Sequence, residues 1–320
     1  LLGAIVIVIS DVQVIAAWKN FFQDPLRAIG LTFQSIGVAY GAWLKGCFGS
    51  PVDFFRGLQT FFATGNTKPL LNSIWAITES LTAASPYILT GLGVAVGFKC
   101  GLFNIGVEGQ FLIGSLVAAW VGYTFHLPWY IHLPLALVGG ILGGALWAAI
   151  PGYLKAATGA HEVVNTIMMN YIAFRLSDWL LRGPMMATGF RPVTPVIDST
   201  AALPRFFDDP LRFNIGFFLA LLVALFIYWL LFKTTLGFEI RSVGANPHAS
   251  KYAGMNVTGN FILAMVISGG LAGLGGAVQV LGTDLWVGQG FSAGYGFDSL
   301  AVALLGNSHP FGVVMAALLF

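Results

Sequence analysis

Apolar stretches long enough to cross a bilayer, about 20 residues each, recur along almost the whole chain. Only 9% of the 320 residues are charged, and 57% are hydrophobic. A chain of this composition cannot cover its own surface with polar groups, which excludes soluble enzymes, nucleic-acid-binding proteins and disordered proteins. The 41 glycines suit packed membrane helices, because glycine lets two backbones approach closely. The sequence therefore predicts an all-α integral membrane protein.

We expect one transmembrane domain over residues 1–320, a polytopic bundle of about eight to ten helices. The candidate spans are Leu1–Ala17, Leu71–Phe98, Gly106–Phe125, Ile131–Leu154, Val163–Leu181, Phe213–Phe232 and Val257–Leu281, followed by the shorter pieces Phe297–Leu305 and Phe311–Phe320. Residues 18–70 are predicted to form an outer or re-entrant segment. Because the chain begins and ends inside apolar runs, we expect further sequence at both ends.

Two loops between the spans are long enough to carry interactions. Residues 183–212 contain five prolines and the pair Asp208 and Asp209, and they fall on the same side as residues 18–70. A proline-rich loop costs less entropy to order, so we expect this outer loop to contact a partner. Residues 234–257 fall on the opposite side.

The second loop contains start and stop signals for a short helix. Asn246 suits an N-cap, Pro247 suits the first helical position, and Gly254 suits the residue just past the end. A helix of about seven residues spans about 10 Å and cannot cross a bilayer. It either closes the loop as a surface helix or inserts into a partner and transmits its movement.

Three motifs of the chain resemble permease subunits of ABC importers, in the branch that handles sugars, branched-chain amino acids and nucleosides. The motifs run from Phe238 to Val257, from Gly101 to Phe111 and from Gly294 to Gly306. The last two are similar to the nucleoside and simple-sugar subgroup. The resemblance implies a second permease subunit, ABC ATPase subunits that bind ATP and magnesium, and an extracellular substrate-binding protein.

The resemblance also implies an orientation in a bacterial cytoplasmic membrane, with the short helix as the cytoplasmic coupling helix. That orientation leaves ten of the 15 Lys and Arg residues outside, against the usual excess of positive charge inside. The residues implied in coupling to the ATPase are Gly244, Ala245, Asn246, Pro247, Ala249, Tyr252, Ala253 and Gly254.

Polar residues within the spans are candidates for a substrate pathway, because polar groups are costly in a bilayer unless they face a cavity or a partner. The candidates are Glu79, Asn104, Glu108, Gln110, Asn165 and Asp298. Asn104 and Glu108 are four residues apart, which predicts a shared helical face, and Gly101 and Gly106 permit a break in the backbone. Glu108 either braces two helices by hydrogen bonds or lines the pathway.

No motif indicates catalysis, a bound metal or a cofactor in this chain. His161, Glu162 and Asn165 lack the second histidine of a zinc-binding HExxH motif, and no phosphate-binding P-loop is present. Neutral polar groups and aromatic rings suit an uncharged solute. The sequence thus predicts an ABC importer permease for a nucleoside or simple sugar. A stand-alone secondary transporter, with Glu108 or Glu79 carrying a proton, is the alternative.

Overall fold

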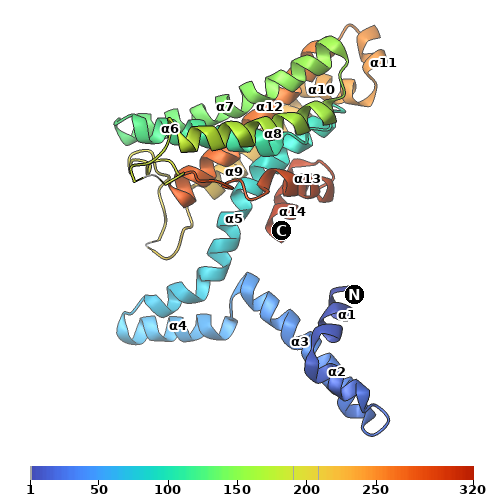
Figure 1. Ribbon diagram of the computed structural model, residues 1–320, viewed down its shortest axis with the longest axis vertical. Helices are drawn as coiled ribbons and strands as arrows, with labels where there is room; N and C mark the ends of the chain where they lie inside the picture. Colours follow the sequence, from blue (N-terminus) through green and yellow to red (C-terminus); the bar gives the residue numbers. More distant parts are fainter. Residues whose placement is uncertain (1, 190, 208) are drawn as a thin grey trace. The chain divides into compact units, whose positions relative to one another are not determined.

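The computed structural model describes residues 2–189, 191–207 and 209–320, and over these residues the chain is built from helices without β-strands longer than isolated bridges (Figure 1). The predicted all-α fold is confirmed. The chain divides into two compact units, Leu1–Ser80 and Leu81–Phe320, which are described separately. The assignment of residues 1–320 to a single domain stays a prediction.

The N-terminal unit contains four complete helices and the first part of a fifth. They are α1 (Leu2–Ser10), α2 (Val12–Lys19), α3 (Pro25–Phe48), α4 (Pro51–Thr64) and α5 (Lys68–Lys99). The prediction of one span over Leu1–Ala17 is wrong, because Asp11 divides it. The Asp11 carboxylate accepts the backbone N–H groups of Gln13 and Val14, at 2.9 and 3.3 Å, and so caps a new helix.

The second unit contains the rest of α5 and the remaining helices. They are α6 (Val107–Thr124), α7 (Trp129–Thr158), α8 (Glu162–Arg182), α9 (Gly216–Lys233), α10 (Thr235–Ala245), α11 (Pro247–Tyr252), α12 (Val257–Gln279), α13 (Tyr295–Leu305) and α14 (Pro310–Leu319). A single π-helical turn, Val280–Asp284, extends α12.

The centre of this unit is the packing of α6, α7 and α12, which lie side by side in Figure 1. Glycines make this contact possible: a side chain at Gly114 or Gly140 would collide with α12 at Gly273 or Ala277. Gly144 likewise lies directly against Gly269. Small residues at helix interfaces are the usual device for close packing in membranes.

Length and apolarity single out four helices that can cross a membrane among the described residues: Lys68–Lys99, Trp129–Thr158, Gly216–Lys233 and Val257–Asp284. The pair α13 and α14, bent by 120°, makes up to five if it counts as one broken span. Helices α6 and α8 pack against α7 but carry buried polar residues. The count of eight to ten spans stays a prediction.

The two ends of the bundle carry different structures. Helix α11 lies at one end, and the long loop before α9, drawn in yellow, lies at the other (Figure 1). Backbone hydrogen bonds hold this loop to the chain that leaves α12: Thr194 N–H donates to Val287 O at 2.8 Å, and Ile197 N–H donates to Leu285 O at 2.9 Å. The loop is therefore tied to the segment that leads into α13.

Candidate functional site

A break in the chain precedes α6, at the position that the glycines of the sequence indicated. Gly101 has a φ of +73°, and Asn104 lies in the non-helical stretch before α6 begins at Val107. The prediction that Asn104 and Glu108 share a helical face is therefore wrong. The Asn104 side chain instead accepts the Gly106 N–H at 3.0 Å and stabilises the non-helical backbone.

Buried amide side chains hold this break in place. Asn104 Nδ2 donates to Gln110 Oε1 and to Ser268 Oγ, each at 2.9 Å, which joins the break to α12. Asn170 of α8 accepts the Gly109 N–H and donates to Ile105 O, again at 2.9 Å. Because these amides bond within the protein, Asn104 and Gln110 fit a bracing role. Their contact with a solute stays a prediction.

Glu108 caps the start of α13. Its Oε2 accepts the Gly296 N–H at 2.7 Å, and the Ser292 hydroxyl and the N–H groups of Gly294 and Phe297 lie near this carboxyl group. A side chain at Gly296 would collide with the backbone of Glu108, so only glycine allows this approach. The positive end of a helix dipole and its free N–H groups favour a carboxylate at this point.

The start of α13 lies deep in the bundle. Asn104 bonds to Ser268, the twelfth residue of the 23-residue helix α12, and Glu108 follows Asn104 by four residues. Helix α13 therefore begins near the level of the middle of α12, after a non-helical approach in which Leu285, Gly290, Ala293 and Gly294 have positive φ. A helix that starts at mid-depth is a common element of transporter sites.

Aromatic side chains gather beside this helix start. The Tyr295 ring stacks on the buried Phe111 ring, with centroids 5.5 Å apart, and lies 4.8 Å from the Tyr87 ring. The Phe291 ring lies 6.1 Å from Phe111. We call the half-buried rings of Tyr87, Phe291 and Tyr295 the aromatic surface.

Asp298 borders the aromatic surface. The Tyr87 hydroxyl donates to Asp298 Oδ2 at 3.1 Å, a contact between α5 and α13. Sequence reasoning named Asp298 as a pathway candidate but missed Tyr87 and Phe291, because nothing in the sequence ties these distant residues together.

The other two pathway candidates lie elsewhere. Glu79 is half-buried on α5, within the N-terminal unit. Asn165 lies in the first half of α8, and its buried Nδ2 has no hydrogen-bond partner among the described residues. The structure does not bring Asn165 into the network around Asn104.

The short helix α11 has the caps that the sequence predicts. Asn246 accepts the Ala249 N–H at 3.0 Å, Pro247 is the first residue, and Gly254 has a φ of +83°. The Met255 N–H donates to Ser250 O at 3.0 Å and closes the C-terminal turn. The exposed members of the predicted coupling set are Ala245, Asn246, Pro247, Ala249, Tyr252, Ala253 and Gly254.

Two features distinguish members of this set. The Tyr252 side chain is almost fully solvent-accessible, at 97%. Gly244 differs from the others, because it packs so closely on Lys99 and Cys100 at the end of α5 that a side chain would not fit. Gly244 thus joins the short helix to the bundle, and the exposed residues are the ones available to a partner.

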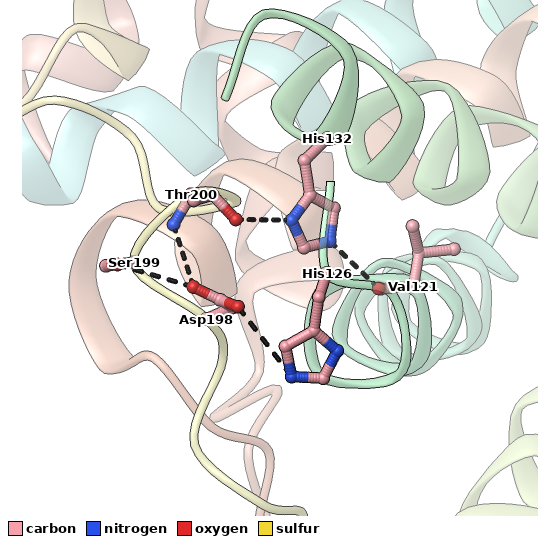
Figure 2. A network of polar contacts seen from close by, with 6 residues as sticks. All are labelled: Val121, His126, His132, Asp198, Ser199 and Thr200. Atoms are coloured by element: carbon pink, nitrogen blue, oxygen red, sulfur yellow. Dashed lines mark hydrogen bonds and ion pairs between the residues drawn. The ribbon is translucent and has the colours of Figure 1, made fainter. Parts of the chain in front are cut away.

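A polar network fastens the long loop at the opposite end (Figure 2). Asp198 accepts the Thr200 N–H at 3.1 Å, and this backbone bond holds the pKa of the Asp198 carboxyl below its ordinary value. The buried His132 ring contacts Thr200 Oγ1 at 2.7 Å and Val121 O at 3.1 Å. Because a carbonyl oxygen only accepts, the proton on this ring is placed at Nε2. The exposed His126 lies 4.0 Å from Asp198. Sequence reasoning found no signal for this network.

Comparison with known proteins gives a family and several relatives. Residues 76–320 match the family described as "Branched-chain amino acid transport system / permease component". The guanosine ABC transporter permease NupP of Bacillus subtilis is 46% identical over 255 residues, which cover 78% of this chain and 73% of that protein. The nucleoside permease NupB of Lactococcus lactis is 39% identical, covering 78% and 71%. The glucose permease TsgB13 of Haloferax volcanii is 35% identical, covering 78% and 68%. No solved structure matches the chain.

Proposed function

The chain belongs to the family of permease components of branched-chain amino acid transport systems, and we propose that it is the ABC importer permease subunit for a nucleoside. It is a multi-pass protein of the cytoplasmic membrane and a transport component. The similarity to the permeases named for guanosine and for nucleosides supports the proposed solute class.

The observation that carries the proposal is the position of Glu108. The N-terminus of a helix that begins at mid-depth attracts an anionic group of a solute when that end is open. Here Glu108 already occupies it, with the Gly296 N–H at 2.7 Å. A phosphate or carboxylate of a solute would find the Gly296 N–H already bonded to the Glu108 carboxyl group. The arrangement favours an uncharged solute, such as a nucleoside, over a nucleotide.

The proposed partners follow from the two ends of the bundle. ABC ATPase subunits, which carry ATP and magnesium and perform the hydrolysis, dock on the exposed residues of α11. An extracellular substrate-binding protein docks at the end that carries residues 183–212. A second permease subunit, a copy of this chain or a homologue, completes the pathway. The exposure of Pro247, Ala249 and Tyr252 supports the first of these contacts.

A simple sugar is the second candidate solute. The similarity to a permease named for glucose, at 35% identity, is the observation that favours it. A sugar is uncharged as well, so the position of Glu108 does not separate it from a nucleoside. The separation requires a transport measurement.

Uptake by the complete transporter tests the proposal. Cells that carry the permease, its ATPases and its binding protein take up a labelled purine nucleoside in the presence of an excess of unlabelled competitor. We expect competition by nucleosides and none by glucose or by nucleoside monophosphates. Uptake of labelled glucose by the same cells, without uptake of the nucleoside, would support the sugar, and competition by a monophosphate would contradict the argument from Glu108. Uptake that survives ATP depletion but stops with the proton gradient would indicate a secondary transporter.

A further inference from the structure

We propose that the aromatic surface of Tyr87, Phe291 and Tyr295 stacks on the base of the nucleoside during passage, while Asp298 and the Tyr87 hydroxyl accept and donate hydrogen bonds to its polar edge. This inference rests on the proposed function and specifies the solute contact within the permease. According to this proposal, the permease distinguishes a nucleoside from a simple sugar by these rings, because a simple sugar has no base to stack on them.

The first step is that the aromatic surface is supported from behind but not closed. Phe111 is fully buried and stacks on Tyr295 with an angle of 28° between the rings. Tyr87, Phe291 and Tyr295 are all half-buried, and the Phe320 ring lies 5.8 Å from the Tyr87 ring. A rigid, partly accessible ring is a suitable platform for a base, because stacking needs a preformed face and tolerates different bases.

The second step is the polar border of the rings. The Tyr87 hydroxyl donates a hydrogen bond to Asp298 Oδ2 at 3.1 Å. Packing alone does not require these groups. A second aromatic cluster in the same unit, formed by Tyr228, Phe232, His309 and Phe311, has ring contacts of 4.9–5.8 Å but no carboxylate bonded to its tyrosine among the described residues.

The third step is the place of the rings in the fold. Tyr295 is the first residue of α13, and the next residue, Gly296, is the one whose N–H bonds to Glu108. Phe291 lies in the non-helical approach to α13. The aromatic surface therefore surrounds the helix start at mid-depth, where a passing solute meets interrupted rather than continuous helices.

Variants of the complete transporter test this inference. Tyr295→Leu removes the ring, Tyr295→Phe keeps it, and Tyr228→Leu removes a half-buried ring from the second cluster as a matched control. The readout is nucleoside uptake at saturating loaded binding protein, with docking of the binding protein and assembly of the complex measured in parallel. We expect Tyr295→Leu to lower uptake roughly tenfold, as loss of one stacking contact does. Tyr228→Leu should transport like the parent, and Tyr295→Phe, which keeps the ring, should retain more uptake than Tyr295→Leu.

A second variant covers the case in which Tyr295→Leu does not assemble. Tyr87→Phe keeps the ring and removes only the hydroxyl that bonds to Asp298, and we expect it to assemble and to lose several-fold in nucleoside uptake. If Tyr295→Leu assembles and its uptake equals that of the parent, the inference is overturned. If Tyr295→Leu does not assemble, parental uptake in Tyr87→Phe overturns it. So does an equal loss in the Tyr228→Leu control. If the parent itself imports glucose and no nucleoside, the proposed function has failed, whatever the variants do.

Discussion

At the residue scale, Glu108 joins α6 to α13 through a carboxylate that several donors share. Glu108→Gln keeps one oxygen that accepts the Gly296 N–H, but it places an NH2 group among N–H donors. We expect it to assemble with a loss of roughly 1–2 kcal/mol in the free energy of unfolding, because charge-assisted hydrogen bonds become neutral ones. Glu108→Ala leaves the buried donors without an acceptor, and we expect poor assembly.

Thermal unfolding in detergent and the yield of assembled complex measure both Glu108 variants. Glu239→Gln is the matched control, since Glu239 is a half-buried glutamate that accepts a single bond from Asn260 at 3.0 Å. If Glu108→Gln assembles with parental stability but transports poorly, the capping role does not explain the loss of transport, and Glu108 contacts the solute instead.

Asp198 gives a prediction for pH at the same scale. Its pKa is lowered in the folded loop by the Thr200 N–H. A lowered carboxyl pKa contributes stability above the ordinary value of about 3.9, and that contribution is lost as the pH falls through the folded pKa. Between about pH 5 and 8 the backbone amides of this turn should thus stay equally protected from hydrogen exchange. Hydrogen exchange over residues 197–203, corrected for intrinsic rates, measures it.

Asp198→Asn should raise exchange in this turn to the same extent at each pH, because the carboxylate is charged throughout the range. His126→Gln is the control for the neighbouring histidine. If the parent gains protection as the pH falls from 8 to 5 and His126→Gln does not, the contact of His126 with Asp198 rather than Asp198 alone governs the turn.

At the element scale, α11 is the helix that the sequence predicted in most detail. Its Asn246 cap, its first-turn proline and its terminal glycine act through neighbouring backbone atoms, so a local pattern is sufficient to predict them. The division between α1 and α2 was missed because the long apolar run hid the capping capacity of Asp11. The sequence predicted α13 from Phe297, close to its observed start at Tyr295, but it did not predict the cap, because the cap comes from Glu108, 188 residues from Gly296.

Helix α11 also carries the prediction on coupling. Ala249 is exposed, and Ala249→Asp places a charge in the proposed contact with the ATPase. We expect normal insertion and folding, because the site is solvated, and loss of solute-stimulated ATP hydrolysis. Ala157→Asp, at an exposed alanine near the end of α7, is the control. Undiminished stimulation in Ala249→Asp would exclude α11 as the coupling element.

At the scale of the second unit as a whole, the loop before α9 and the start of α13 form one continuous structure. Residues 194–203 are bonded to residues 281–287, and that segment continues to Gly296 and its contact with Glu108. The sequence indicated a stiff outer loop through its prolines. It gave no sign of which segment the loop pairs with, because backbone hydrogen bonds between distant segments depend little on side-chain type.

Residues 183–212 therefore have two separate predicted roles. One is docking of the binding protein, and the other is transmission of that docking to the start of α13. Asp208 lies outside the described residues, but Asp209 has a side chain that is 86% exposed and accepts a bond from Arg205 at 3.2 Å. Asp209→Lys should weaken docking of the binding protein in a salt-sensitive manner. Thr194 acts differently, because its hydroxyl accepts the Val287 N–H at 3.0 Å and is buried.

Thr194→Val keeps the shape of the side chain but leaves the Val287 N–H without its acceptor. We expect this to destabilise the contact between the loop and the segment that leads into α13 by about 1–3 kcal/mol. We therefore expect parental docking of the binding protein but weaker stimulation of ATP hydrolysis and slower uptake. Asp209→Lys should show the opposite order, with weak docking and parental uptake once the binding protein is supplied in excess. Docking of the binding protein and uptake of the solute, measured on the same preparations of both variants, distinguish the two roles. Parental uptake by Thr194→Val, at parental stability, would show that docking reaches the solute pathway by another route.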